Sequence, residues 1–293
     1  MELRVLRYFL TVAREQTISG AAQSLHLSQP TLSRQILDLE EELGVTLFIR
    51  GNRKITLTEE GMLLRKRAEQ IVDLVRKTEE DLGAADDAVR GTIYIGAGES
   101  HAFRTVASSI VNLLAEQTGV RIDIFSGNAE DVTERLDKGL LDFGLLIEPT
   151  DVTNYDYIRL PIADRWGLIM RKDSPLAALE AIGPDDVRDV PVLCSRRVLK
   201  GGQLSSWLQT DPEKLNLVAT YNLIFNATLL VEEGLGYAFS LEHLVETMGS
   251  GKLCFRPLKP ALESQVHLVW KKYQVFSKPS ELFLQKIRAA LGG

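Results

Sequence analysis

Cysteine is almost absent from this chain of 293 residues, which contains only Cys194 and Cys254. The two lie sixty residues apart with no CxxC spacing, which argues against a disulfide framework or a zinc site and fits a reducing compartment. His243 and His267 lack acidic or cysteine neighbours at metal-ligand spacing. We therefore expect two packing thiols and no bound metal.

Long hydrophobic runs are also missing. No apolar stretch approaches the roughly 18 residues of a membrane span, and charges interrupt the apolar pattern of the first residues, unlike a signal peptide. With 45% hydrophobic and 25% charged residues, the composition is that of an ordinary globular protein, and the length suggests about two domains. The sequence therefore predicts a cytoplasmic protein with no membrane partner.

An excess of basic charge is the third absence. The net charge of −6 weakens any assignment to nucleic-acid binding that rests on composition alone. Residues 1–58 nevertheless hold seven Arg or Lys and six Asp or Glu, for a net charge of +1. Four of the six acidic residues cluster at the end of one predicted helix, whereas Arg34, Arg50, Arg53 and Lys54 stand apart from them. The four are Asp38, Glu40, Glu41 and Glu42. The local arrangement must therefore decide what this segment binds.

Three short helices are predicted in the first 44 residues. Apolar residues at helical spacing predict a first helix over residues 3–15. Ser19 is expected to cap a short second helix, and Ser28 a third helix that has Pro30 in its first turn and ends at Gly44. The third helix is expected to bury one apolar stripe, formed by Leu32, Ile36, Leu39 and Leu43.

A small hairpin should follow these helices. Apolar positions 47, 49, 55 and 57 flank the turn-like pair Gly51-Asn52. Beyond it, residues 58–87 carry a heptad pattern, which predicts a long helix that pairs with a second copy of itself. The alternative is a helix that packs within its own chain. The heptad positions are Leu64, Ala68, Ile71, Val75, Thr78 and Leu82.

After residue 90 the sequence alternates between strand and helix patterns, which predicts parallel strands with crossover helices. The chain is expected to form two α/β lobes and to cross between them near residues 160–162 and 264–267, with a cleft between the lobes. The expected strands are residues 92–97, 120–125, 141–148, 166–172, 190–195, 215–221, 236–240, 253–258 and 266–272. The expected helices begin at Ser100, end near Gly139, and cover 203–208, about 225–234 and 280–291.

The third helix presents a polar face. Burial of its apolar stripe leaves Gln29, Pro30, Ser33 and Arg34 on the free side. Gln and Arg can form bidentate hydrogen bonds to adenine and guanine edges in the major groove, and a helix–turn–helix presents its second helix in this way. The alternative is a solvated polar face on an ordinary helical bundle.

Residues 21–61 resemble the N-terminal domain of the LysR-type transcriptional regulators. Later segments, LLDFGLLI and LLVEEGLGYAFS, are similar to that family as well, so the resemblance covers essentially the whole chain. The matching residues are Ala21, Ala22, Leu25, Ser28, Gln29, Pro30, Ser33, Ile36, Leu39, Glu40, Leu43, Gly44, Leu47, Phe48, Arg50, Leu57, Thr58 and Gly61.

The resemblance implies a winged helix–turn–helix over 1–58, a coiled-coil linker helix over 59–89 and a two-lobed α/β effector domain, like periplasmic binding proteins, over 90–293. Lobe I would comprise 90–161 and 267–293, and lobe II 162–266. It also implies an effector-responsive dimer, commonly assembled into a tetramer, on a double-stranded DNA site with dyad symmetry. Gln29, Pro30, Ser33 and Arg34 would face the major groove, and Thr31 either contacts DNA or only satisfies the helix start.

The same resemblance places basic residues of the hairpin on DNA. Arg50, Arg53 and Lys54 would contact the phosphate backbone or the minor groove, where contacts supply affinity and salt dependence. A local charge of only +1 indicates weak non-specific binding, so several copies are needed to gather enough contacts.

Effector-binding candidates lie where strands should end at the cleft. Ser100 is expected to cap a helix, and family members similarly use hydroxyls at this turn to hold a small, often anionic, effector. Beside it stand Glu99 and His101, which leave the sign of the effector open. Each of the candidates has an ordinary alternative as a cap, a turn residue or a solvated side chain. They are Ser100, His101, Asn128, Ser195, Arg196 and Asn226.

Cofactor binding and catalysis are not expected. Gly96 and Gly98 follow a strand, but the dinucleotide fingerprint needs a third glycine where this chain has His101. No nucleophile–base constellation is visible. The rival hypotheses are a cytoplasmic small-molecule binding protein whose N-terminal helices serve assembly only and, less favoured, a metabolic α/β enzyme.

Overall fold

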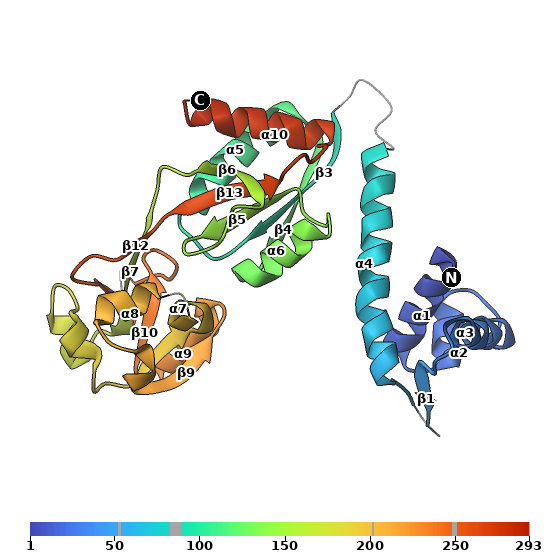
Figure 1. Cartoon of the computed structure of the whole chain (residues 1–293), viewed down its shortest axis with the longest axis horizontal. Helices are drawn as coiled ribbons and strands as arrows, with labels where there is room; N and C mark the ends of the chain where they lie inside the picture. Colours follow the sequence, from blue (N-terminus) through green and yellow to red (C-terminus); the bar gives the residue numbers. More distant parts are fainter. Residues whose placement is uncertain (52–53, 83–88, 201, 248–250, 293) are drawn as a thin grey trace. The chain divides into compact units, whose positions relative to one another are not determined.

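The computed structural model describes residues 1–51, 54–82, 89–200, 202–247 and 251–292. The chain divides into two compact units, Met1–Gly83 and Ala84–Gly293 (Figure 1). Within the described residues, no helix is both long enough and apolar enough to cross a membrane.

Three helices build the core of the first unit: α1 (Leu3–Glu15), α2 (Ile18–Ser24) and α3 (Gln29–Leu43). The predicted start and end of α3 are confirmed, because the Ser28 hydroxyl accepts the backbone N–H of Thr31 at 3.3 Å and Gly44 ends the helix at a φ of 67°. Phe9 is fully buried in this core, and its ring packs against the ring of Phe48 with centroids 5.2 Å apart.

Two details of this region differ from the sequence-based prediction. Thr17, not Ser19, caps α2, because its hydroxyl accepts the backbone N–H of Gly20 at 3.1 Å and the helix therefore begins before Ser19. Leu43 does not complete the buried stripe of α3. It is the last residue of the helix, is 38% exposed and does not belong to the core of this unit.

The predicted hairpin is present as antiparallel strands β1 (Phe48–Arg50) and β2 (Ile55–Leu57). Asn52 of its predicted turn lies outside the described residues. The hairpin is tied to α3 by Glu40, whose Oε1 atom accepts the backbone N–H groups of Leu47 at 2.6 Å and Phe48 at 3.1 Å. This half-buried carboxylate therefore fixes where the hairpin begins relative to α3.

Replacing Glu40 with alanine should lower the free energy of unfolding of the first unit by about 1.5–3 kcal/mol, because two hydrogen bonds to a charged acceptor are lost. Hydrogen exchange of peptides from residues 1–82 would measure the change. Glu41→Ala is the matched control, because Glu41 is the exposed neighbour and its side chain takes no part in this tie. Equal effects of the two substitutions would contradict the assignment.

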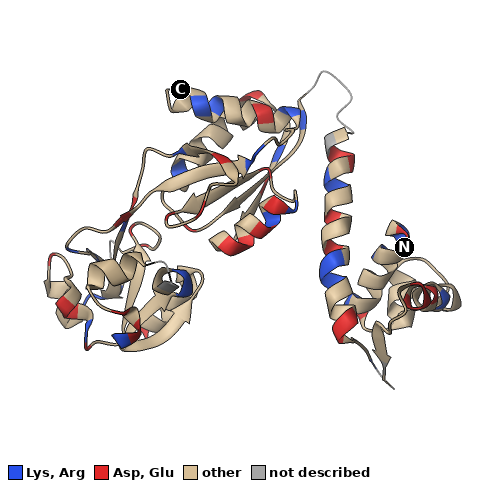
Figure 2. Ribbon diagram, in the orientation of Figure 1, with Lys and Arg blue, Asp and Glu red and all other residues tan. Residues whose placement is uncertain are grey.

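The long helix α4 spans Glu59–Leu82 and carries ion pairs between successive turns, such as Arg76–Glu80 at 3.0 Å (Figure 2). Its heptad positions do not form one free seam as predicted. Ala68 is buried against the core of the first unit, with Leu64 beside it, because α4 packs on α1. Ile71 and Leu82 are 38% and 77% exposed, so only the later positions stay open to a partner.

The second unit contains two sheets. The first has the strand order β4-β3-β5-β13-β6, with α5 (Phe103–Glu116) and α10 (Lys278–Ala290) packed together on one face and α6 (Ala129–Asp137) on the other (Figure 1). Alternate residues of the central strand feed the two cores, with Ile93 and Ile95 on one face and Tyr94 on the other. Its strands are β3 (Arg90–Ala97), β4 (Gly119–Ser126), β5 (Phe143–Ile147), β6 (Tyr155–Arg159) and β13 (Val266–Lys271).

The second sheet has the order β11-β7-β10-β8-β9, with β12 also paired to β7. Helix α9 (Ile224–Glu232) packs on one face of it and α8 (Gln203–Leu208) on the other. The short helix α7 (Arg196–Lys200), which the sequence did not predict, follows β8 directly. The strands are β7 (Asp164–Arg171), β8 (Val192–Ser195), β9 (Leu217–Tyr221), β10 (Tyr237–Leu241), β11 (Leu253–Pro257) and β12 (Glu263–Ser264).

The chain passes between the sheets twice, between β6 and β7 and between β12 and β13, close to the expected positions. The expectation of parallel strands holds only in part. Strands β3, β4 and β5 are mutually parallel, as are β8, β9 and β10, whereas β7 and β13 run antiparallel to their neighbours. Strands β7 and β13 are each the first long strand after the chain passes from one sheet to the other. A parallel pairing of consecutive strands needs a crossover connection, usually a helix, and no helix directly precedes either of these strands.

Candidate functional site

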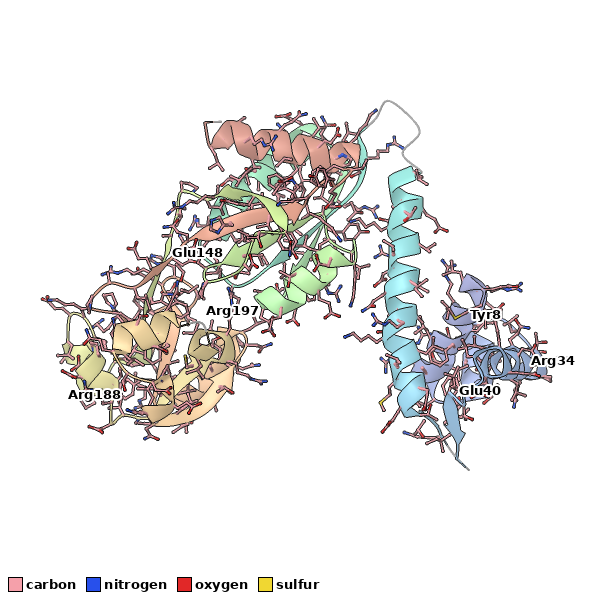
Figure 3. The ribbon with its side chains drawn as sticks, in the orientation of Figure 1. Tyr8, Arg34, Glu40, Glu148, Arg188 and Arg197 are labelled. Carbon is pink, nitrogen blue, oxygen red and sulfur yellow. The ribbon has the colours of Figure 1, made fainter. Side chains whose placement is uncertain are left out.

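The start of α3 forms an exposed polar face in the first unit. Gln29, Pro30, Thr31 and Arg34 are exposed, and Ser33 is half-buried. The Arg34 side chain points outward from the helix (Figure 3), and it forms no ion pair with any residue that the structure describes. Its guanidinium is therefore available to an acceptor outside this unit.

The remaining candidates of this unit lie near the helix start and on the hairpin. The Thr31 hydroxyl is 2.7 Å from the Ser28 hydroxyl, so it takes part in the cap of α3. Arg50 ends β1 and pairs with Ile55. Lys54 is exposed, and its carbonyl accepts the Gly51 N–H at 3.0 Å. Arg53 lies outside the described residues.

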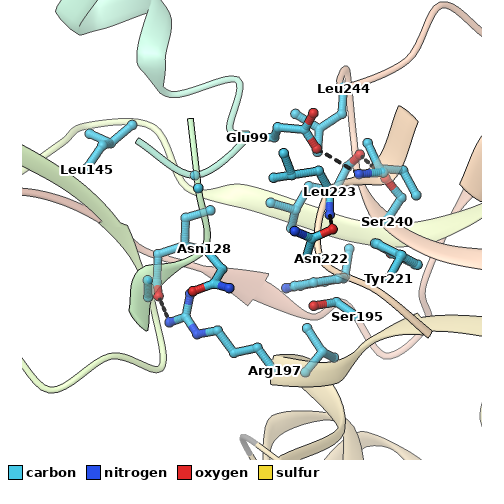
Figure 4. Close-up of a pocket in the computed structure, with 18 of the residues that line it drawn as sticks. Glu99, Asn128, Leu145, Ser195, Arg197, Tyr221, Asn222, Leu223, Ser240 and Leu244 are labelled. Carbon is cyan, nitrogen blue, oxygen red and sulfur yellow. Dashed lines mark hydrogen bonds between the residues drawn. The ribbon is translucent and has the colours of Figure 1, made fainter. Parts of the chain in front are cut away.

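In the second unit a cavity lies where the two sheets meet, with about 100 Å³ of space open to the centres of water molecules. Its wall is built at the carboxyl ends of parallel strands, which is where α/β folds generally bind ligands. Glu99, Asn128 and Glu148 follow β3, β4 and β5, and Ser195 and Asn222 end or follow β8 and β9. Apolar side chains complete the wall: Leu145, Leu223 and Leu244, which Figure 4 labels, and Ile147, Trp166 and Leu241.

Two of the six effector-binding candidates, Asn128 and Ser195, line this cavity. The other four are absent from its described lining. Arg196 and Asn226 are exposed elsewhere on the surface, and Ser100 and His101 lie in the turn before α5, next to the cavity wall.

Ser100 does not cap α5 in the predicted way. The helix begins at Phe103, and the buried Ser100 hydroxyl accepts the backbone N–H of Ala102 at 3.0 Å. The His101 ring lies 4.7 Å from the His243 ring, centroid to centroid, which joins a loop of the first sheet to a loop of the second. These side chains are thus occupied in packing the turn.

A buried carboxylate, Asp164 at the start of β7, faces this turn. The Ser100 hydroxyl and the backbone N–H groups of Ala102 and His101 lower its pKa, but burial outweighs them and raises the pKa above the ordinary value of 3.8. Neither oxygen of Asp164 completes a hydrogen bond of normal geometry within the described residues. The ionised form is therefore costly in the folded chain.

Asp164→Asn should raise the free energy of unfolding at pH 7–8 by about 1 kcal/mol. A carboxyl group whose pKa is raised by folding stabilises the fold fully below the unfolded pKa, and that contribution is lost as the pH rises through the folded pKa. The difference between variant and parent should therefore shrink as the pH falls toward 4. Urea unfolding at several pH values would measure it.

Asp173→Asn is the matched control for this substitution, because Asp173 is an exposed carboxylate that is ion-paired with Arg171. It should not raise the stability at neutral pH. A pH-independent difference between Asp164→Asn and the parent would contradict the argument.

Two side chains that are not among the six effector-binding candidates connect the sheets across the cavity. The Glu99 Oε2 atom accepts the backbone N–H of Ile224, the first residue of α9, at 2.8 Å. Arg197 donates from Nη2 to the carbonyl of Pro149 at 2.9 Å, to the carbonyl of Ile147 and to the hydroxyl of Thr150.

The sequence carried a weak signal for both residues, since Glu99 and Arg197 stand beside the candidates Ser100 and Arg196. Nothing local distinguishes them from their neighbours. Tyr221 and Ser240 also line the cavity, but their hydroxyls donate to the carbonyls of Phe239 and Leu241.

Neither cysteine belongs to the cavity lining that the structure describes, and both are buried. Burial raises the pKa of Cys194 to about 12, so that thiol is protonated at neutral pH. Among the described residues there is no group of three or more His, Cys, Asp or Glu side chains that could hold a metal ion.

Two family models match the chain. Residues 3–62 match the bacterial regulatory helix-turn-helix protein of the lysR family, and residues 86–292 match the LysR substrate binding domain. The second match alone covers well over half of the chain.

Individual proteins show the same similarity. The chain is 29% identical over 284 residues to the Hca operon transcriptional activator HcaR of Escherichia coli K12, which covers 93% of this chain and 92% of that protein. It is 25% identical over 297 residues to the HTH-type transcriptional regulator YvbU of Bacillus subtilis, covering 100% and 99%. The structure of full-length CbnR with its target DNA has the same fold, with a TM-score of 0.77 at 18% identity over 99% of this chain and 100% of that one.

Proposed function

The chain belongs to the LysR family of bacterial transcriptional regulators, and we propose on that premise that α3 enters the major groove of a double-stranded DNA site with dyad symmetry. Arg34 carries the proposal, because it is exposed at the helix start without an ion pair to any described residue. Arg is the side chain best suited to bidentate contact with guanine. The other proposed contacts are Gln29, Pro30, Thr31 and Ser33.

The hairpin supplies the proposed contacts to the sugar–phosphate backbone, through Arg50, Arg53 and Lys54. Such contacts carry affinity and salt dependence but little sequence information. We place the DNA-binding domain at 1–58, the linker helix at 59–89 and the effector domain at 90–293, a division that the two family matches support.

A second copy of the chain is the proposed partner of α4. Apolar side chains on this helix remain open, among them Leu63 at 61%, Leu74 at 42% and Leu82 at 77% exposure. Burying such a face against its equal would place two α3 helices on two half-sites. Pairs of dimers would give the tetramer.

The cavity of the second unit is the proposed effector site, with Asn128 and Ser195 among its contacts. It lies between two sheets joined by only two passages of chain, so an effector can bias their arrangement through its differential affinity for the alternatives. The protein would then work in the cytoplasm, where promoter DNA and small metabolites are both accessible.

The test is a mobility-shift titration on the DNA upstream of the coding region and on random DNA, at two salt concentrations. Arg34→Ala should lose about 1–3 kcal/mol of discrimination between the two DNAs. Arg76→Ala is the matched control, because it removes an exposed arginine of the same unit that is ion-paired on α4. It should leave discrimination unchanged.

If the parent and both variants bind no DNA at either salt concentration, the role of α3 is wrong. The small-molecule binding protein would then be the better description. If the parent binds specifically and the two variants lose discrimination equally, Arg34 acts through charge alone and the base contact is contradicted.

A further inference from the structure

At the starts of α9 and α6, beside the cavity, backbone N–H groups already donate to side chains of the protein itself. Glu99 accepts the first N–H of α9, and Asn128 caps α6 by accepting the Asp131 N–H at 3.0 Å while Asp131 accepts the Asn128 N–H at 3.2 Å. The turn before α5 faces the buried carboxylate of Asp164. These three positions are therefore unfavourable for the charged group of an anionic ligand.

Hydrogen-bond donors remain on another part of the wall. The Asn128 amide nitrogen, the Ser195 hydroxyl and the Nε and Nη1 atoms of Arg197 have no hydrogen-bond partner among the described residues. Figure 4 shows these three side chains on the side of the cavity away from Glu99. They come from three different elements, β4–α6, β8 and α7, and converge only in the folded chain.

Arg197 brings a charge to the cavity that no described carboxylate neutralises through an ion pair. The groups that accept its hydrogen bonds are neutral, namely two carbonyls and one hydroxyl, and no carboxylate of the described residues forms an ion pair with it. The side chain is half-buried, and burial lowers its pKa by more than the Glu130 carboxylate, which does not form an ion pair with it, raises it. A guanidinium nevertheless remains charged near neutral pH. A cation in such surroundings is stabilised by an anionic partner.

The opposite part of the wall has the reverse sign. Glu99 lines the cavity there. Glu148 also belongs to the lining, but it lies between Ile147 and Pro149, whose carbonyls accept from Arg197, and its Oε1 atom is 3.8 Å from His267 Nε2. Apolar side chains, among them Trp166, Leu145 and Leu223, make up much of the remaining wall. The cavity thus has an anionic group, Glu99, on one side and a cationic group, Arg197, on the other.

We propose that the effector is a small organic acid with one carboxylate on Arg197, Asn128 and Ser195, and with an apolar body that carries no second anion toward Glu99. This rests on the effector role proposed for the cavity. A dicarboxylate of the same length is disfavoured because its far end would meet the Glu99 carboxylate.

A matched set of six-carbon probes tests the charge preference on the full-length protein: hexanoate, hexanamide, hexylamine and adipate. Cyclohexanecarboxylate and its amide provide a second pair with a bulkier body. The readout is the thermal transition followed by tryptophan fluorescence, with Trp166 in the cavity wall. Each carboxylate should bind at least about tenfold more tightly than its amide, and adipate should bind more weakly than hexanoate.

Three variants locate the two ends of the ligand. Arg197→Gln should reduce the affinity for the carboxylate probes about tenfold or more, whereas Arg196→Gln, the exposed neighbour, should not change it. Glu99→Gln keeps an acceptor for Ile224 and should improve the binding of adipate relative to hexanoate. If Arg197→Gln does not fold, Arg197→Lys retains the charge and should still prefer carboxylates to amides.

The proposal is overturned if no carboxylate of either pair binds more tightly than its amide, or if hexylamine binds best. It is also overturned if Arg196→Gln and Arg197→Gln behave alike. DNA binding by the same samples without probe separates this result from failure of the regulatory function. Specific DNA binding without a preference for carboxylates would contradict only the proposed chemistry of the effector. Carboxylate binding without any DNA binding would contradict the regulatory role.

Discussion

Phe9→Ala is expected to lower the free energy of unfolding of the first unit by about 3–5 kcal/mol. Phe9 is fully buried and its ring packs against Phe48, the first residue of β1. Truncation would leave a cavity between α1 and the hairpin. The loss includes the transfer free energy of the ring and the contacts of its neighbours, so DNA binding should fail at moderate temperature.

The two units can be observed separately for this test. The three tryptophans, Trp166, Trp207 and Trp270, all lie in the second unit, so their fluorescence follows that unit alone. Hydrogen exchange of peptides from residues 1–82 follows the first unit. Phe9→Ala should accelerate that exchange and leave the fluorescence transition in place.

Phe225→Ala is the matched control, because it makes the same truncation at a ring that is 65% exposed on α9. It should change the stability of either unit by less than about 0.5 kcal/mol. A Phe9→Ala protein whose exchange matches that of the parent would mean that the core of the first unit is not organised around this ring.

The limits of α3 could be predicted because they depend on local chemistry. A serine hydroxyl, a proline in the first turn and a glycine at positive φ act within a few residues of the helix ends. The start of α2 was harder, because Thr17 and Ser19 both carry a capping hydroxyl. Only the backbone geometry selects Thr17, whose hydroxyl reaches the Gly20 N–H.

The fate of an apolar stripe is not a local property. The heptad pattern of α4 correctly indicates an apolar side, but Ala68 is buried within its own unit while Leu82 remains exposed. The pattern cannot distinguish a neighbour in the same chain from a second copy. In the same way, the strand pattern of β13 contains no information on its antiparallel pairing with β5.

The cavity was the least predictable part. Strand ends at Asn128 and Ser195 could be found from the α/β alternation, and both line it. The sequence could not show which of Arg196 and Arg197 faces the cavity, because a helix of five residues is too short to carry a periodic pattern of buried positions. Arg197 is oriented by hydrogen bonds from its guanidinium to the carbonyls of Ile147 and Pro149, which lie about fifty residues earlier in the chain.

Gly236→Ala is expected to destabilise the second unit by about 3 kcal/mol or more, and two effects contribute. Gly236 has a φ of 153°, which L side chains rarely adopt, and an added Cβ atom would overlap the carbonyl oxygen of Pro191. That carbonyl also accepts the Tyr237 N–H at 2.9 Å, directly before Tyr237 pairs with Val192 in β8. The clash must therefore separate β10 from β8.

Gly234→Ala separates the two contributions. Gly234 also has positive φ, at 88°, but no atom of the described residues other than its chain neighbours lies within 4 Å of an added Cβ. It should cost only the conformational part, roughly 1–2 kcal/mol. Tryptophan fluorescence during urea unfolding measures both variants, and equal shifts would show that the Pro191 contact does not matter. Because Ser195 ends β8 and Ser240 lies in β10, both in the cavity wall, parting these strands should abolish probe binding in Gly236→Ala while Gly234→Ala retains it.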